Sequence, residues 1–225
     1  MGGCDTPSVD WQAKLAWADA EHERRLASVA GPDEREDFRL AGIAGASWAA
    51  GLAALMLGRD DEARDRLLRA ADEYDTSWRA APPGSWGRPI AMIRCRLMAG
   101  DHDRARADAS AAVGAGALDA PGPIGGYCAA LALLVLGRDE DAEVVAARIA
   151  DEGLDPAAVA EALGALARGD GPAFAAARLA VLRSFEARDA FLEDVPVADT
   201  VLVLDALALE RGLELPPLPS PLLPG

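Results

Sequence analysis

The stretch from Leu52 to Tyr74, LAALMLGRDDEARDRLLRAADEY, decides the fold that this sequence predicts. Its first half repeats apolar residues at spacings of three and four, which places them on one helical face. Gly58 can close that helix in the left-handed conformation, and Asp60 or Asp61 can cap a second helix. The second helix carries an apolar stripe of Ala63, Leu67, Ala70 and Tyr74. Because so short a turn leaves two helices side by side, the stretch predicts an antiparallel helical hairpin.

The same pattern returns around Gly100, Gly137 and Gly169, where an apolar run ends in glycine and an acidic residue follows within two positions. Hydrophobic residues make up 51% of the chain, much of it Ala and Leu, whereas aromatic residues make up only 5%. The best candidate strand, Val201 to Leu204, continues into a helical pattern and is interpreted as helix. We therefore predict an all-α fold of about ten helices, with antiparallel hairpins stacked in one repeat domain over residues 1–225.

Three of the predicted turns share a spacing of glycine followed by alanine five positions later: Gly58 and Ala63, Gly100 and Ala105, Gly137 and Ala142. This spacing resembles the turn of a tetratricopeptide hairpin. The position two after the glycine, usually aromatic or aliphatic in that family, is Asp60, His102 or Asp139 here. The resemblance covers roughly Leu52 to Phe185 and implies a TPR-like α-solenoid.

The end of the chain carries a second pattern, in which a Leu/Ala-rich helix ends in Arg-Gly and a Ser-Pro turn precedes a terminal Leu-Pro. The matching residues are Leu202, Leu204, Ala206, Leu207, Ala208, Arg211, Gly212, Leu213, Ser220, Pro221, Leu223 and Pro224. The pattern resembles the C-terminal signature of a helical immunity-protein family of polymorphic-toxin systems. That resemblance implies binding and neutralisation of a toxin without catalysis, and it identifies no contact residues.

Both ends of the chain differ from the repeats. We expect residues 1–8 to be flexible; their start, MGGCDT, matches a myristoylation pattern, with Cys4 as a second acylation site, but a chance match is the preferred interpretation. The proline-rich tail, residues 213–225, predicts an extended segment. We expect it to lie back on the last helices, the alternative being a ligand for a groove-binding domain.

The charge and the cysteine content limit which classes of partner and which cellular location the sequence favours. Lys and Arg total 22 against 37 Asp and Glu, a formal net charge of −15, which disfavours nucleic acid and favours a basic protein or peptide. Cys4, Cys95 and Cys128 share no CxxC spacing, so we expect reduced thiols in a cytoplasmic protein, with Cys95 and Cys128 packed on helices. The longest apolar run, Ala41 to Gly58, is interpreted as a buried helix rather than a membrane span.

Candidate catalytic and metal-binding groups are sparse. Asp101-His102-Asp103 is the best metal candidate, but the equivalent turn at Gly137 does without histidine, so a capping role is preferred. Glu21, His22 and Glu23 point in different directions on a helix. The stretch from Gly122 to Gly126 is interpreted as a helix-linking loop because no strand precedes it. We therefore expect no enzyme activity, metal or other cofactor.

The remaining candidate for a functional site is a binding surface. Tryptophan and arginine are over-represented at interface hot spots, and several gather around the irregular stretch from Asp75 to Arg88. The candidate binding residues are Trp48, Trp78, Trp86, Arg88, Arg94 and Arg96. The alternative for each tryptophan is a core or loop anchor. The first functional hypothesis is a protein-binding repeat, which can use its concave face. The alternative is a small-molecule-sensing or enzymatic helical domain with a pocket near residues 75–96.

Overall fold

The computed structural model describes residues 9–28 and 35–225, and over these residues it contains ten α-helices, two short 3-10 helices and no strand. The α-helices are α1 (Trp11–Ala27), α2 (Glu36–Met56), α3 (Asp60–Ala80), α4 (Gly87–Met98), α5 (His102–Gly114), α6 (Gly122–Val135), α7 (Asp139–Asp151), α8 (Ala157–Arg168), α9 (Gly171–Glu186) and α10 (Asp199–Glu210). The 3-10 helices are η1 (Ala117–Asp119) and η2 (Leu192–Asp194). The predicted all-α class is confirmed.

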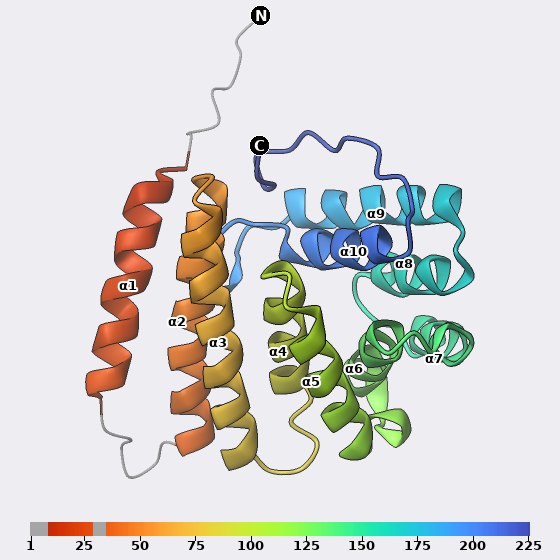
Figure 1. Cartoon of the computed structure of the whole chain (residues 1–225), viewed down its shortest axis with the longest axis horizontal. Coiled ribbons are helices and arrows are strands. Elements are labelled where there is room, and N and C mark those ends of the chain that lie inside the picture. The colour runs from red at the N-terminus through yellow and green to blue at the C-terminus, as the bar shows by residue number, and fades with distance from the viewer. Residues whose placement is uncertain (1–8, 29–34) are drawn as a thin grey trace, which may run out of the picture.

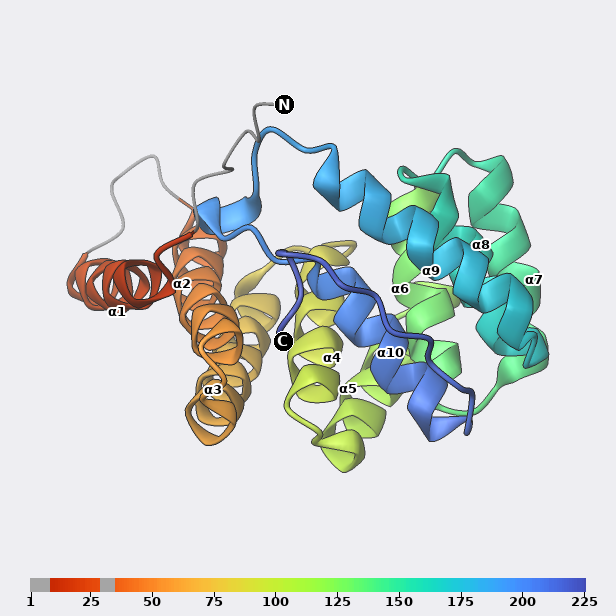
Figure 2. The same cartoon turned by 90° about the horizontal axis from the view of Figure 1, so that it is seen from above.

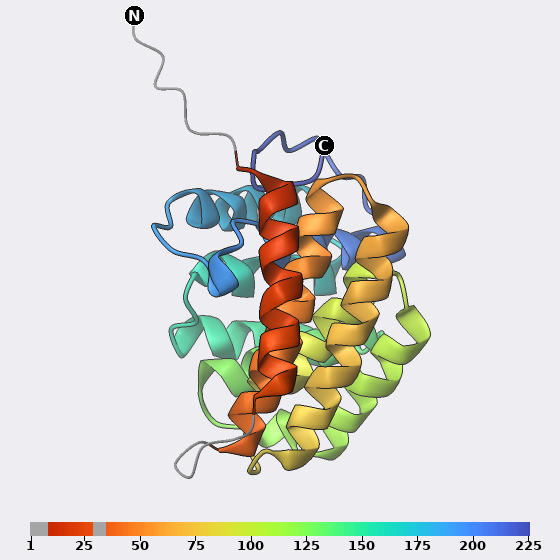
Figure 3. The ribbon, with the colours of Figure 1, turned by 90° about the vertical axis from the view of Figure 1, so that its left-hand side faces the viewer.

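Helices that follow one another in the chain pack against one another, in the hairpins α2–α3, α4–α5, α6–α7 and α8–α9. Their axes turn from upright in α1 to α3 to horizontal in α8 to α10 (Figure 1). The first helices of successive hairpins also touch, α4 with α6 and α6 with α8, and so form the inner layer of an arc. At the N-terminal end, α1 covers the outside of the α2–α3 hairpin (Figure 3).

The four hairpin turns share one backbone geometry. Gly58, Gly100, Gly137 and Gly169 all adopt the left-handed conformation, with φ between 64° and 69°. The N–H after each glycine donates to the carbonyl five residues earlier, at 2.9–3.0 Å. This is the Schellman arrangement, which satisfies carbonyls that the ending helix leaves free. The prediction that these glycines close helices is confirmed.

This fixed geometry decides which acidic residues act as caps, because every second helix begins two residues after its glycine. Asp101 and Asp170 directly follow a glycine and accept the amides of Arg104 and Ala173, at 3.2 and 3.0 Å. In the other two turns an arginine takes the cap position without a side-chain hydrogen bond, and the acidic residues lie in the first helical turn. The predicted caps Asp60 and Asp61, and their counterparts in 139–141, are therefore wrong.

Gly42, Gly45 and Gly51 in the apolar run of α2 predict either close packing or a break in the helix, and the structure shows close packing at Gly45 and Gly51. A Cβ at Gly51 would lie 2.8 Å from Cγ of Leu67 on α3. α2 is continuous, and it is the one described helix long and apolar enough to cross a bilayer. Since 67% of its most apolar window is buried inside the protein, it serves as a core helix here.

Tertiary packing also moves several predicted boundaries. The expected loop from Asp75 to Arg88 is shorter, because α3 continues to Ala80: the buried Ser77 hydroxyl donates to the Asp37 carbonyl at 2.7 Å. The expected loop from Gly122 to Gly126 belongs to α6, where a Cβ at Gly126 would lie 2.1 Å from Cγ2 of Ile149.

The sequence pattern also suggests Ser8 and Asp155 as N-caps, and the structure differs at both helix starts. Asp10, rather than Ser8, caps α1 through the amide of Ala13, at 2.9 Å, and Ser8 lies outside the described residues. Pro156, rather than Asp155, is the N-cap of α8. In both cases the helix begins one or two residues later than the sequence pattern suggested, which is the usual uncertainty of helix ends.

The C-terminal part of the chain covers the inner face of the arc. α10 packs on α4, α8 and α9, and the extended tail runs along it (Figure 2). Arg178 on α9 pairs with Asp205 of α10 and donates to the carbonyl of Pro216 at 2.7 Å. The carbonyl of Leu222 accepts the N–H of Ala198 at 2.9 Å. The prediction that the tail is extended and lies on the last helices is confirmed.

The buried stripe of α3 gives a direct test of the hairpin packing. Leu67 is 1% exposed, lies on the backbone of Gly51, and belongs to the N-terminal core cluster. We expect Leu67→Ala to lower the free energy of unfolding by about 2–5 kcal/mol, because it leaves a cavity between α2 and α3. Leu209→Ala is the control, since Leu209 is 63% exposed, and should cost under about 0.5 kcal/mol. Urea denaturation measures both; equal losses would show that the stripe does not carry the packing.

Candidate functional site

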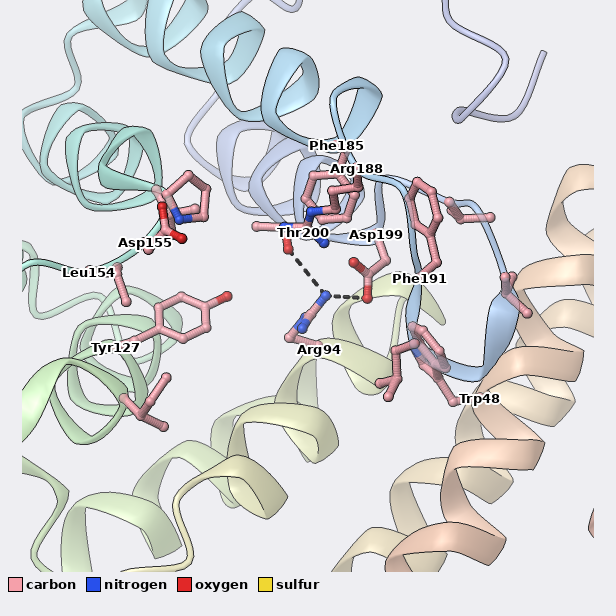
Figure 4. A pocket seen from close by; sticks show the side chains of 16 residues that line it. Trp48, Arg94, Tyr127, Leu154, Asp155, Phe185, Arg188, Phe191, Asp199 and Thr200 are labelled. Carbon is pink, nitrogen blue, oxygen red and sulfur yellow. Dashed lines mark hydrogen bonds and ion pairs between the residues drawn. The ribbon is translucent and has the colours of Figure 1, made fainter. Parts of the chain in front are cut away.

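A cavity lined by aromatic and charged side chains lies between the inner layer of the arc and the segment that joins α9 to α10 (Figure 4). Its volume is about 260 Å³. Helices α2, α4, α6 and α8 supply one side, and the end of α9, the joining segment and the start of α10 supply the other. The residues that line it are Trp48, Arg94, Ile124, Tyr127, Leu154, Asp155, Pro156, Val159, Phe185, Arg188, Phe191, Leu192, Val195, Val197, Asp199 and Thr200.

The joining segment, residues 187–198 and here called the clasp, crosses from α9 to α1 and α2 (Figure 2). Glu193 forms two hydrogen bonds of 2.8 Å with Arg25 of α1. A Cβ at Gly45 of α2 would lie 2.8 Å from the Glu193 carboxylate, so a larger residue there would displace this carboxylate. Lys14 pairs with the neighbouring Asp194. The clasp therefore ties the C-terminal hairpins to the N-terminal helices and closes the cavity.

An ion pair forms the floor of the cavity. Arg94 of α4 pairs with Asp199 at the start of α10 and donates to the Thr200 hydroxyl at 3.3 Å. Burial opposes the charge of Arg94, but Asp199 outweighs it and raises the pKa of Arg94. The Nε of Arg94 is buried without a hydrogen-bond partner. Because 20% of the Arg94 side chain stays exposed and it lines the cavity, the guanidinium retains donor capacity toward the cavity.

Aromatic side chains form the walls. Trp48, Phe185 and Phe191 surround the space, and the hydroxyl of Tyr127 points into it (Figure 4). Burial raises the pKa of Tyr127, so the phenol stays protonated and can donate a hydrogen bond at neutral pH. The guanidinium of Arg188 lies 3.7 Å from the centre of the Phe185 ring. Such a combination of apolar walls with a few convergent polar groups is typical of ligand pockets.

The six predicted binding residues do not form one cluster. Trp48 and Arg94 line the cavity, whereas Arg96 lies on the opposite face of α4, because residues two apart on a helix point in different directions. Arg96 is buried and pairs with Asp72 and Asp108, at 2.5 and 3.4 Å.

The other three lie on the side of the arc where α2 and α4 begin. Arg88 donates to Asp37 at 3.0 Å and stacks over the Phe38 ring at 5.0 Å. Trp78 and Trp86 are half-buried and pack against the core clusters. The structure thus places these tryptophans as anchors between elements, which was the alternative interpretation for each.

No protein family, curated protein or solved structure matches this chain. Sequence reasoning missed Tyr127, Phe185, Phe191, Asp199 and Thr200, all of which line the cavity. No local pattern pointed to them, because they come from α6, α9, the segment after α9 and α10, which are far from Arg94 in the sequence.

The remaining reactive groups are held in structural contacts. Cys95 and Cys128 are free and buried, as expected, and burial raises the pKa of each thiol to about 12. His22 is buried and its Nε2 lies 2.8 Å from Glu73 of α3. Within residues 9–28 and 35–225, no group of three His, Cys, Asp or Glu side chains is placed to hold a metal ion. Cys4 and the myristoylation pattern lie outside the described residues.

The raised thiol pKa values predict low reactivity. At pH 8 a thiol with a pKa of about 12 is about a thousandfold less ionised than a free cysteine. Because the thiolate is the reactive form, labelling should be slowed to a similar extent. In a Cys4→Ser chain we expect no labelling by a thiol reagent until the protein unfolds, and two labels per chain in denaturant. Rapid labelling of the folded chain would contradict the burial of these residues.

The clasp predicts a measurable stability difference. Glu193→Gln keeps the shape of the side chain but removes the charge that pairs with the half-buried Arg25, so we expect a loss of about 1–3 kcal/mol. Asp75→Asn is the control, since its partner Arg79 is 78% exposed and such a pair contributes about 0.5 kcal/mol or less. Hydrogen exchange in residues 187–198 should rise only in the first variant. An equal effect in both would show that this pair does not hold the clasp.

Proposed function

We propose that this chain is a non-catalytic, cytoplasmic binding protein that recognises another protein, as an immunity-type inhibitor of a toxin. The supporting observation is an apolar surface at the mouth of the cavity. Ile124 of α6 and Leu192 of the clasp are 55% and 67% exposed, and both line the mouth. Trp17 of α1 is 43% exposed and shares a neighbouring hollow with Phe191. These four residues define what we call the binding face.

The binding face has the composition of an interface. Aromatic residues are enriched in protein interfaces, and contiguous exposed apolar residues mark interaction sites. Lys14, Asp194 and Arg188 lie beside the apolar side chains and supply a charged rim. The concave face, by contrast, is largely covered by α10 and the tail, so a partner would meet the rim of the arc.

Charge favours a basic protein as the partner. The net charge of −15 attracts a basic surface at long range and repels the phosphates of nucleic acid, and we propose neither nucleic acid nor a membrane as a target. The C-terminal residues that resemble the immunity-protein signature hold α10 in place. Arg211 among them donates to the Leu134 carbonyl at 2.8 Å and to Asp139 at 2.5 Å, which fixes α10 to the α6–α7 hairpin.

The proposal predicts a partner encoded beside this protein. We expect one product of an adjacent gene to arrest growth when expressed alone, and co-expression of this chain to restore growth and give a 1:1 complex by light scattering. The double variant Trp17→Ala/Leu192→Ala should raise the dissociation constant at least tenfold, because exposed aromatic anchors carry much of the binding energy.

Val144→Ala is the matched control for that experiment. Val144 is 71% exposed on α7, away from the binding face, and its loss should leave affinity unchanged. Thermal denaturation of all variants separates lost contacts from lost folding. Absence of any complex with the adjacent gene products would contradict the immunity-type function, and unchanged affinity in the double variant would contradict the assigned face.

A second function, small-molecule sensing, is favoured by the cavity itself. Arg94 lies in the region where the sequence placed a possible pocket, near residues 75–96, and it forms the cavity floor. Aromatic walls with a few convergent polar groups are typical of pockets for small molecules.

A further inference from the structure

We infer that the cavity binds a small aromatic monocarboxylic acid, with its carboxylate on Arg94 and its ring among Trp48, Phe185 and Phe191. This inference rests on the small-molecule function and names the class of ligand. It is independent of the protein-binding proposal.

The carboxylate position follows from the hydrogen bonds that Arg94 leaves unused. A guanidinium has five N–H donors, and the bonds of Arg94 to Asp199 and Thr200 both come from Nη2. The side chain faces the cavity and remains partly exposed. The protonated Tyr127 hydroxyl points toward the same space and can donate a second hydrogen bond. Donors from two helices therefore point into one cavity, where a carboxylate group can accept from both.

The charges at the cavity favour an anion over a cation. Asp199 is already paired with Arg94, and Asp155 lies exposed at the rim, where water screens it. Arg188 stacks on Phe185 without a carboxylate partner among the described residues. Its guanidinium occupies the aromatic face that a cationic ligand would need. A ligand with positive charge would meet two arginines, whereas an anion would meet one with free donors and one without a counter-ion.

The volume of the cavity and its aromatic lining favour a ligand with a single ring. A volume of about 260 Å³ lies just below the usual range of about 300–1,000 Å³ for ligand pockets. Trp48 and Phe191 provide flat apolar surfaces, and Phe185, whose face carries Arg188, can meet a ring at its edge. Aromatic pairs prefer such offset or edge-to-face contact. One carboxylate is expected, because Asp199 already neutralises part of the charge on the cavity floor.

Calorimetry of the full chain with phenylacetate, phenylacetamide and acetate tests this inference. Phenylacetamide has the same ring and shape without the charge, and acetate has the charge without the ring. We expect phenylacetate to bind at least tenfold more tightly than either. Equal affinity for the amide would overturn the carboxylate assignment while leaving small-molecule binding in place. Failure of all three probes to bind at millimolar concentration would overturn the inference.

A double variant tests whether Arg94 is the residue that binds the carboxylate. Arg94→Gln/Asp199→Asn removes both charges together, so that neither is left buried without its partner, and should abolish the preference for phenylacetate over the amide. The matched control is Arg138→Gln/Asp141→Asn, an exposed pair at the α6–α7 turn, which should keep the full preference. Survival of the preference in the first double variant would overturn the role of Arg94.

A second measurement needs no change to the cavity floor. The indole N–H resonance of Trp48, assigned by its loss in Trp48→Phe, should shift on addition of phenylacetate to the unaltered chain. The resonances of Trp78 and Trp86, which lie outside the cavity, should stay in place. A shift of those two without Trp48 would place the ligand elsewhere and overturn the assignment.

Discussion

The pairing of Glu193 with Arg25 is the contact on which the rest of the site depends. It joins residues 168 positions apart and fixes the clasp against α1 and α2. A stack of helical hairpins is quasi-one-dimensional, since each hairpin touches mainly its neighbours, so it encloses no space by itself. The clasp adds a long-range contact that closes the open side of the arc. The cavity and the apolar surface at its mouth both follow from that closure.

Much of the architecture could be predicted from the sequence because its determinants are local. The turn at Gly58 needs a left-handed residue, the apolar spacing of three and four sets the buried face, and Leu67 lies on that face. Each of these constraints acts within a few residues. The errors arose where packing overrode local preference. Gly126, expected in a loop, lies inside α6 with its backbone against Ile149, and α3 continues past its predicted end, where the Ser77 hydroxyl donates to the Asp37 carbonyl.

The site could not be predicted in the same way. Trp48 and Arg94 were among the candidates because of their residue types, but Asp199, which pairs with Arg94, lies in a different part of the chain. Arg96 has the same residue type as Arg94, yet it points to the other side of α4, where it pairs with Asp72 and Asp108 and donates to the Leu68 carbonyl. Residue types near a loop therefore identify side chains that are chemically able to bind a ligand or partner. Which of them face one cavity depends on how the hairpins stack, and a single sequence does not state that.

The backbone of the clasp is strained beside the cavity. Glu193 and Asp194 adopt φ values of 51° and 55°, a left-handed conformation that costs about 1–3 kcal/mol for a residue with a side chain. Glycine at either position would avoid this cost, as it does at the hairpin turns. A residue with a carboxylate is instead required at both, because Arg25 and Lys14 bind there. The chain thus accepts local strain beside the cavity to secure its closure, and such strain is concentrated at functional sites more than in scaffolds.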